Sequence, residues 1–469
     1  MTANRPTVET TQIPGLLVLR LDVREDARGW FKENWQREKM VALGLPDFGP
    51  VQNNISFNAA RGATRGIHTE PWDKFVSVAN GRIFGAWVDM RDGDTFGATF
   101  HIEVDPSIAV FVPRGVGNSY QTLEDGVAYT YLVNEHWRPG TAYPALNLRD
   151  ETAAIPWPIP LDECEISEKD LANPRLNAVT PMAPKKTLII GALGQLGRAL
   201  QPAFPGADLV DLTELDLTDA DAVAAWPWPD YGLVLNAAAY TAVDAAETPE
   251  GRRTAWAANA TAPATLARLS DEHGFTLVHY SSEYVFDGTV SDHTEDEPLT
   301  PLGVYAQTKA AGDLAVGTAA RHYVLRTSWV IGEGNNFVRT MKRLADQGAS
   351  PDVVSDQVGR LTFTSELTRA TRHLLDATAP FGTYNLSNGG PAMSWADIAG
   401  AVFELSGRVA DDVRPITTEQ YAAGKALAPR PASSTMSLDK IRATGFEPQE
   451  QLEALRSYLQ ANTATEARP

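Results

Sequence analysis

The spacing of hydrophobic residues changes once along the chain, and this change predicts two kinds of domain. Between about Ile13 and Glu165, short apolar runs recur and are separated by Gly, Asp, Asn and Pro. They lie at Gly15–Asp22, Asn53–Asn58, Phe75–Asn80, Ile83–Met90, Thr99–Val104, Ala109–Val112 and Tyr129–Val133, with one helical pattern near Trp35–Leu43. Runs of this length, rich in aromatic and β-branched residues, are typical of strands. Many short strands at regular spacing predict an all-β sandwich or jelly roll.

From Leu188 onward, expected strands alternate with helix-length stretches. The strands are Leu188–Ile190, Asp208–Val210, Leu233–Leu235, Thr276–Tyr280 and Tyr323–Leu325, and the helical stretches include Ala255–His273, Pro301–Ala320, Phe337–Gln347, Thr364–Ala377 and Trp395–Ser406. This alternation predicts an α/β domain with a doubly wound parallel sheet. The repeat weakens after about Asn335, where we expect a lobe on the substrate side. We place the first domain at residues 1–176, a linker at 177–186 and the second domain at 187–469.

The first strand of the second domain runs into a glycine-rich turn, Thr187–Gly197. Its glycines are Gly191, Gly194 and Gly197. A side chain there would stop the backbone from closing on a pyrophosphate, which the N–H groups at a helix start attract. The spacing G-x-x-G-x-x-G differs from the commoner dinucleotide motif, so by itself it also fits a strand–helix turn without a ligand.

Residues for proton transfer follow in chain order. Tyr305 and Lys309 are four apart on an expected helix and share one face, and Ser282 ends an expected strand. An ammonium on that face can lower the phenol's pKa, so that the phenol can exchange a proton with a carbonyl or an alcohol. Asp211, 20 positions after Gly191, can accept bonds from an adenosine ribose and disfavours a 2′-phosphate, but by itself it fits a solvated loop acid equally well.

With these residues in place, the second domain resembles the extended short-chain dehydrogenases, and specifically dTDP-4-dehydrorhamnose reductase. The resemblance spans nearly all of Thr187–Tyr458, including Asn236–Asp244, Tyr284–Gly288 and Arg326–Val330. It implies Tyr305 as general acid with Lys309 and Ser282, and Trp329 and Arg430 as sugar-nucleotide contacts. Ser282 stands in place of the usual threonine and Glu283 in place of the usual aspartate. The expected cofactor contacts are Gly191, Gly194, Gln195, Leu196, Gly197, Asp211, Asp216, Leu217, Ala237, Ala238, Tyr240, Tyr305 and Lys309.

In the first domain, the candidate chemistry centres on His68. A carboxylate such as Asp170 would raise the proton affinity of the imidazole, and a nearby lysine such as Lys74 would stabilise an enolate. Taken alone, His68 also fits a core or loop histidine.

The surrounding residues, Asp26–Glu33, Gln52–Ser56, Arg65–His68 and Ser167–Asp170, resemble dTDP-4-dehydrorhamnose 3,5-epimerase over about Ile13–Leu176. That family is a cupin-like jelly roll and normally a homodimer. The resemblance implies that His68 with Asp170 removes the sugar C3 and C5 protons and that Lys74 stabilises the enolate. The residues expected to hold the substrate are Arg28, Glu33, Gln52, Asn54, Arg65, Asn118 and Trp137.

Two positions depart from the epimerase pattern. Trp137 stands where the family has the tyrosine proposed as the acid on the opposite sugar face, and indole donates hydrogen bonds without usable acidity. We consider His136 or water as its replacement. Asn118 replaces the usual histidine and can still bond a phosphate or sugar oxygen.

Composition limits the partners. A net charge of −19 argues against nucleic acid, and no apolar stretch has the ~18–20 residues of a membrane span. The single cysteine, Cys164, excludes an intramolecular disulfide and fits a reducing compartment, so we expect a cytoplasmic protein.

Together these features predict a fused bifunctional enzyme that epimerises dTDP-4-dehydro-6-deoxy-D-glucose and reduces its 4-ketone with NADPH or NADH. The resemblance also raises magnesium as a cofactor, although no acidic cluster identifies its site. Three alternatives stay open: a reductase with a non-catalytic epimerase-like module, a C3-only epimerase–reductase making another deoxysugar, and a cofactor-binding regulatory subunit.

Overall fold

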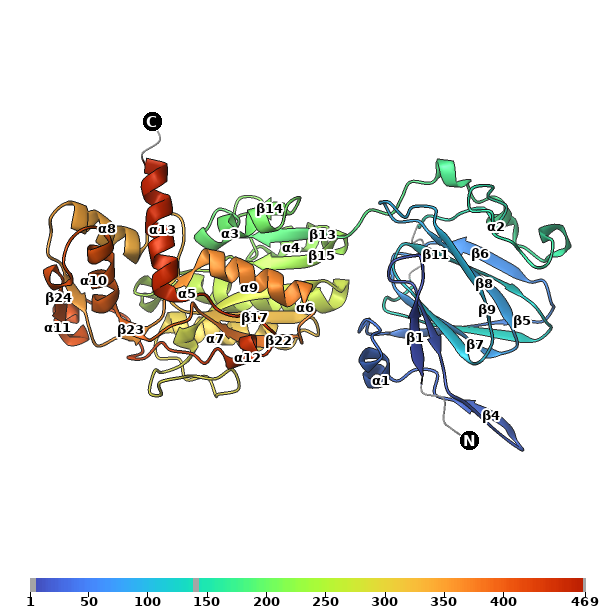
Figure 1. The fold of residues 1–469 in the computed structure, drawn as a ribbon, viewed down its shortest axis with the longest axis horizontal. Helices are drawn as coiled ribbons and strands as arrows, with labels where there is room; N and C mark the ends of the chain where they lie inside the picture. Colours follow the sequence, from blue (N-terminus) through green and yellow to red (C-terminus); the bar gives the residue numbers. More distant parts are fainter. Residues whose placement is uncertain (1–5, 138–142, 467–469) are drawn as a thin grey trace. The chain divides into compact units, whose positions relative to one another are not determined.

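The computed structural model describes residues 6–137 and 143–466, which belong to two compact units, Met1–Pro184 and Lys185–Pro469 (Figure 1). The stretch 177–184, expected as linker, is part of the first unit. The reason is packing: Met182 donates its N–H to the Met90 carbonyl at 2.8 Å, and Leu176 is buried in the first unit's core. The second unit begins with its first strand, which starts at Lys186.

Two antiparallel sheets face each other in the first unit, as the short apolar runs predict. The first sheet has the order β1 (Thr7–Thr10), β2 (Leu17–Arg20), β10 (Ile108–Val112), β7 (Lys74–Asn80), β12 (Val127–Val133), β5 (Gln52–Asn58). The second has the order β6 (Thr64–His68), β11 (Val116–Thr122), β8 (Ile83–Asp89), β9 (Thr99–Val104). Apolar side chains from both sheets, among them Val76, Val110 and Trp87, form the core between them.

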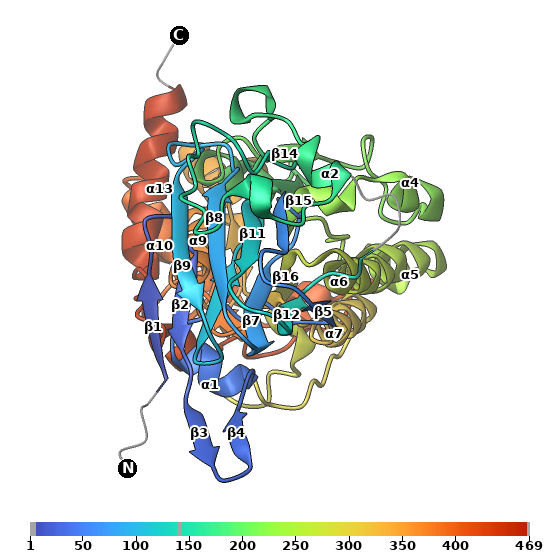
Figure 2. The same cartoon turned by 90° about the vertical axis from the view of Figure 1, so that its right-hand side faces the viewer.

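A separate hairpin, β3 (Val23–Asp26) with β4 (Gly29–Lys32), projects from the body of this unit (Figure 2). Its side chains Trp30 and Phe31 are exposed. The remaining short elements of the unit are α1 (Arg37–Ala42), η1 (Leu161–Glu163), α2 (Glu168–Leu171) and η2 (Leu176–Ala178).

The second unit is built on a parallel sheet of six strands, which confirms the predicted doubly wound class. Its order is β14 (Asp208–Val210), β13 (Lys186–Ile190), β15 (Tyr231–Asn236), β16 (Thr276–Ser282), β17 (His322–Thr327), β22 (Gly382–Leu386). Strand β22 has no counterpart among the expected strands. The connecting helices are α3 (Gln195–Leu200), η3 (Gln201–Ala203), α4 (Ala220–Ala225), η4 (Trp228–Asp230), η5 (Ala245–Glu247), α5 (Pro249–Trp256), α6 (Ala262–His273), η7 (Glu283–Val285), α7 (Val304–Val316) and α9 (Thr364–Asp376).

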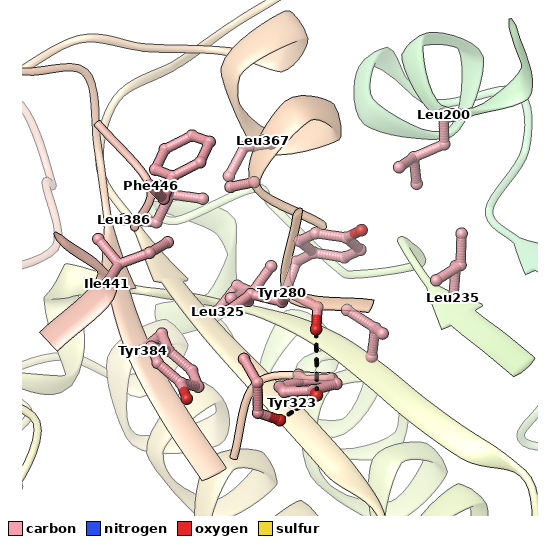
Figure 3. Packing of buried hydrophobic residues seen from close by; sticks show 14 of the residues in the cluster. Leu200, Leu235, Tyr280, Tyr323, Leu325, Leu367, Tyr384, Leu386, Ile441 and Phe446 are labelled. Carbon is pink, nitrogen blue, oxygen red and sulfur yellow. Dashed lines mark hydrogen bonds between the residues drawn. The ribbon is translucent and has the colours of Figure 1, made fainter. Parts of the chain in front are cut away.

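Helices cover both faces of this sheet. On one face, Leu200 of α3 and Leu367 of α9 pack with sheet residues such as Leu325 (Figure 3). On the other, Leu266 of α6 and Val316 of α7 pack in a second cluster. The expected helix Ala255–His273 is continuous in space but contains one π-helical segment, η6 (Ala257–Thr261), between α5 and α6.

A smaller lobe, formed mainly by the last third of the chain, completes the second unit, as expected. Its strand pairs are β18 (Val330–Ile331) with β21 (Thr362–Phe363), β19 (Asp352–Val354) with β24 (Arg414–Ile416), and β20 (Val358–Gly359) with β23 (Met393–Ser394). Its helices are α8 (Phe337–Asp346), α10 (Trp395–Leu405), η8 (Ala410–Asp412), α11 (Thr418–Ala422) and α13 (Gln451–Glu466), whereas α12 (Asp439–Arg442) packs on the parallel sheet beside β22.

Candidate active sites

The first candidate site is a cavity of about 380 Å³ in the first unit, and His68 and Asp170 meet at it. The His68 Nε2 lies 2.7 Å from Asp170 Oδ1, although the two residues are 102 positions apart. Burial alone would raise the Asp170 pKa, but the bonds from His68, Gly66 and Ser167 outweigh it and hold the pKa below its usual value. The carboxylate therefore stays charged beside the imidazole and orients it.

Close packing of β6 on β11 positions this pair. A Cβ at Gly66 would lie 2.4 Å from the Ser119 Cβ, so only glycine fits at that point. Its N–H donates to Asp170 Oδ2 at 3.3 Å, which fixes the carboxylate from the strand side. Asp170 is also held on α2 by the Ser167 hydroxyl, which accepts its N–H and caps this short helix.

Lys74 reaches the same cavity from β7, in the opposite sheet. It is 4% exposed and forms an ion pair with Glu70. Its Nζ lies 5.4 Å from the ring centre of Tyr131 on β12. Burial, and secondarily the Glu70 charge, raise the Tyr131 pKa to about 12. The two sheets thus bring a histidine on one wall and a lysine with a tyrosine on the other.

Most of the expected substrate residues line this cavity. The expected residues that do so are Gln52, Asn54, Arg65, Asn118 and Trp137. The cavity is also lined by residues that the sequence did not predict, namely Glu70, Trp72, Tyr120, Tyr129, Tyr131 and Tyr143. Arg28 and Glu33 are not among the lining residues. Both lie on the β3–β4 hairpin or just after it, where Arg28 pairs with Asp26 and Glu33 with Lys39.

The two departures from the epimerase pattern have different surroundings. Trp137 lines the cavity, and its backbone N–H donates to Gln52 Oε1 at 3.1 Å. Its neighbour His136 is exposed and lies outside the lining set. The Asn118 Oδ1 accepts bonds from Trp87 and Tyr129, at 3.0 and 3.2 Å, so its amide N–H₂ is the group left for a ligand.

The second candidate site begins with a cavity of about 670 Å³ at the carboxyl ends of β13, β14 and β15. The expected residues that line it are Gly191, Gly194, Asp211, Asp216, Leu217, Ala237, Ala238 and Tyr240, and Arg253 and Thr254 line it in addition. Gln195, Leu196 and Gly197 lie beside it on α3 and are not in the lining set. Asp211 accepts the N–H groups of Leu193 and Leu212, each at 2.9 Å, and so ties the glycine turn to the end of β14.

Two glycines of the turn are required by contact. A Cβ at Gly191 would lie 2.6 Å from the Ala238 nitrogen, and one at Gly197 would lie 2.1 Å from the Gly191 oxygen. Gly194 faces the cavity, and its nearest neighbour would lie at 3.3 Å. Because Gly194 lines the cavity, a ligand can approach its backbone, which is what a dinucleotide phosphate requires.

Tyr305, Lys309 and Ser282 come together on α7 and at the end of β16. The Ser282 hydroxyl lies within hydrogen-bonding reach of the Tyr305 phenol. Burial, and then the neighbouring Glu283, raise the Tyr305 pKa. Lys309 donates to the Tyr280 carbonyl at 2.7 Å, and burial lowers its pKa to about 8.

Glu283 is the residue here whose importance sequence reasoning underrated. It is 4% exposed, and its Oε2 accepts a bond from the Ser282 hydroxyl at 2.8 Å. Burial raises its pKa to about 8, against the lowering effect of that bond. A buried carboxyl beside the expected proton-transfer residues was visible in the sequence only as a replacement for aspartate.

Trp329 and Arg430 have protein partners in this structure. Trp329 is 9% exposed and stacks on Trp395, with 3.7 Å between ring centres. Arg430 pairs with Asp244 at 2.9 Å and reaches the Tyr284 hydroxyl. Tyr284 in turn meets Tyr305 edge to face, so Arg430 borders the proton-transfer residues.

Across residues 6–137 and 143–466, no group of three or more His, Cys, Asp or Glu is arranged to hold a metal ion. In the same ranges, no helix is long and apolar enough to cross a membrane.

Comparison with known families decides the relationship. The family model described as RmlD substrate binding domain matches residues 185–464. The chain belongs to this RmlD family. Residues 10–178 match a second family model, dTDP-4-dehydrorhamnose 3,5-epimerase.

Individual relatives agree with both matches. The RmlC homolog of Streptococcus pyogenes serotype M6 is 46% identical over 186 residues, which are 38% of this chain and 92% of that protein. The dTDP-4-dehydrorhamnose reductase of Aggregatibacter actinomycetemcomitans, on the RmlD side, is 36% identical over 59% of this chain and 99% of its own length.

A solved RmlD-type structure, the Bacillus anthracis reductase in complex with NADP, is 31% identical with a TM-score of 0.55, and the match covers 59% of this chain and 99% of that one. Epimerase and RmlD-type reductase domains of the dTDP-rhamnose pathway are therefore present in one chain, which supports a bifunctional enzyme.

Proposed function

We propose that the first unit epimerises dTDP-4-dehydro-6-deoxy-D-glucose at C3 and C5 and that the second reduces the resulting 4-ketone to dTDP-L-rhamnose. The observation that carries this proposal is that each unit holds its own proton-transfer set. His68 bonded to Asp170 lines the cavity of the first unit, and Ser282 lies within reach of Tyr305 in the second.

For epimerisation, His68 is the base. Its ring is oriented by the charged Asp170, and it takes a proton from the carbon next to the 4-ketone. The ammonium of Lys74, buried on the opposite wall, stabilises the enolate oxygen that forms. Arg65, Gln52, Asn54 and the Asn118 amide supply bonds to the rest of the substrate.

Inversion also needs a proton donor on the opposite face of the sugar, and we assign this role to Tyr131. His68 and Tyr131 belong to the two facing sheets and line one cavity. Three other tyrosines line it, but the hydroxyls of Tyr129 and Tyr120 bond Asn118 and Ser56 respectively, and Tyr143 packs edge to face against His68, on the histidine's side of the cavity. Among the described residues, the Tyr131 hydroxyl has no hydrogen-bond partner, and it thus replaces the acid that Trp137 cannot supply.

For reduction, Tyr305 donates a proton to the C4 oxygen, with Ser282 bonding the same oxygen and Lys309 on the adjacent turn of α7. A dihydronicotinamide, when bound, supplies the hydride. The open Gly194 backbone and the cavity residues Asp211 and Asp216 fit such a dinucleotide. The two carboxylates favour NADH over the 2′-phosphate of NADPH.

We further propose that the first unit acts as a homodimer. Strand β5 is a sheet edge, and its Ile55 and Phe57 are 68% and 66% exposed. Exposed apolar side chains on an edge strand favour association. The projecting β3–β4 hairpin would then bring Arg28 and Glu33 to the partner's cavity. Ile55→Asp should shift the sedimentation of the protein from dimer to monomer; an unchanged dimer would contradict this interface.

The decisive experiment follows the sugar by NMR in heavy water. The protein is incubated with dTDP-4-dehydro-6-deoxy-glucose, alone and then with NADH or NADPH. We expect deuterium at C3 and C5 without cofactor, and dTDP-rhamnose once cofactor is added. Exchange at C3 alone would identify another deoxysugar product, and absence of exchange would leave the first unit a binding module.

A further inference from the structure

We propose that Glu283 is the proton store of the reductase site and replenishes Tyr305 through Ser282 during each turnover. This inference rests on the proposed reduction and adds a further residue to it. It starts from the position of the carboxyl group, which lies behind the proton-transfer residues rather than on the surface.

The geometry forms a short chain of exchangeable protons. The Ser282 hydroxyl is bonded to Glu283 Oε2 at 2.8 Å and lies within reach of the Tyr305 phenol. A hydroxyl can accept one proton while it donates another, so Ser282 can pass a proton between the two. Ser282 is itself fixed, because its Oγ accepts the Tyr284 N–H at 3.2 Å.

The surroundings of Glu283 favour a neutral acid. From its own segment it faces Ser282 and Tyr284, from α7 it faces Tyr305, and from the segment after Pro431 it is reached by Ser434. Arg430, which contacts Tyr284 of this set, is directed to Asp244 and Tyr284. Within the described part of the chain, Glu283 forms no ion pair. A buried carboxyl without a cation keeps its proton at neutral pH.

Each proton that the relay donates is replaced in the same turnover. When a hydride reaches C4, the C4–O π bond becomes an oxyanion, which takes the Tyr305 proton. Tyr305 takes the Ser282 proton, Ser282 takes the proton of the Glu283 carboxyl, and the carboxylate is reprotonated from water after product leaves. One hydride and one proton are consumed in each turnover.

The test compares wild type with Glu283→Gln, Glu283→Asp and the control Glu295→Gln. Glu295 is another carboxyl whose pKa burial raises, but it accepts the Asn385 N–H and not a bond from Ser282. We expect Glu283→Gln to lower kcat roughly 10–100-fold with KM for the sugar nucleotide nearly unchanged. The fall of kcat near pH 8 should become smaller in this variant, where Lys309 alone of the two groups still titrates in this range, and should keep its wild-type size in Glu283→Asp and in the control.

A second readout needs no turnover. The infrared difference between wild type and Glu283→Gln, without ligands, should contain a protonated carboxyl band that is lost near pH 8. An ionised carboxylate at pH 6, an unchanged kcat profile, or a raised KM with the basic limb intact would each overturn the proposal. The variant Tyr305→Phe tests the proposed reduction separately from the role of Glu283. If Tyr305→Phe still reduces the ketone, Tyr305 is not the catalytic acid, whatever the role of Glu283.

Discussion

At the scale of single residues, the proposed epimerisation depends on Tyr131, which no local sequence pattern marks. Tyr131 lies in an apolar strand, and its sequence context resembles that of a core residue. Burial and then Glu70, in the turn before β7, raise the pKa of its phenol, and Lys74 of β7 lies over its ring. An acid with a raised pKa near Lys74 can donate once negative charge develops on the sugar.

Tyr131→Phe tests this role. We expect epimerisation to fall by about 10²–10⁴-fold, because the phenol proton is lost while the packing is kept. His68 still removes protons, so heavy-water exchange should continue with retained configuration. NMR of the sugar separates exchange from inversion. His136→Ala is the control and should behave as wild type; a normal inversion rate in Tyr131→Phe would return the role to water.

Glu283 also predicts how stability depends on pH. Its folded pKa, about 8, is above the value near 4.5 of an unfolded glutamate, so the folded state holds an extra proton between these values. Wild-type stability should therefore fall as pH rises through this window, by an upper limit of roughly 4–5 kcal/mol. In Glu283→Gln this fall is absent. Thermal unfolding of wild type and of Glu283→Gln at pH 5 and pH 9 measures this change. The same difference in melting temperature between the two proteins at both pH values would contradict the prediction.

At the scale of elements, the glycines in the turn between β13 and α3 have two different roles. Gly197 allows α3 to lie against the turn, and Gly194 leaves the cavity open. Both residues stand in the same motif, which gives no means of telling them apart. The distinction appears only when the atoms opposite each missing Cβ are known.

The matched variants Gly197→Ala and Gly194→Ala test this separation. The first should destabilise the second unit by at least about 2 kcal/mol, since its Cβ would meet the Gly191 oxygen. The second has an ordinary φ of −70° and should cost under about 1 kcal/mol while weakening cofactor binding roughly tenfold. Denaturant unfolding measures the loss of stability and cofactor titration measures the loss of binding. A larger loss of stability in Gly194→Ala than in Gly197→Ala would contradict the roles given to the two glycines.

Elements with regular hydrophobic periodicity could be predicted from the sequence, and polar ones could not. The expected strands of the parallel sheet and the helices near α8, α9 and α10 are all present. Strands β6 and β11 were not expected, because Thr64–His68 and Val116–Thr122 are largely polar. Their buried side chains, Asn118, Ser119 and Gln121 among them, are satisfied by hydrogen bonds across the fold. The hydrophobic periodicity therefore fails in the two strands that line the cavity or support it.

At the scale of the whole molecule, the chain consists of two units with separate cores. The clusters around Val76 and Ile67 lie in the first unit, and those around Leu325, Val234 and Ile398 lie in the second. Each described hydrophobic cluster is thus complete within one unit, and each parallel or antiparallel sheet is as well.

Residues 1–184 and 185–469, produced separately, should therefore each fold. We expect the calorimetric transitions of the two pieces to add up to those of the full chain, with shifts of no more than a few degrees. The pieces should also retain exchange and reduction respectively. A piece that stays unfolded by circular dichroism would show that the units depend on each other.

The division between Pro184 and Lys185 also fixes a ratio that separate proteins cannot hold. One round of translation yields one site that makes the epimerised ketone and one that removes it. When the first site is saturated, a change in expression alters both rates equally, so the pool of reactive ketone depends on the kcat of the first site and on the kcat and KM of the second. Its steady level is then a property encoded in the polypeptide and insensitive to gene dosage.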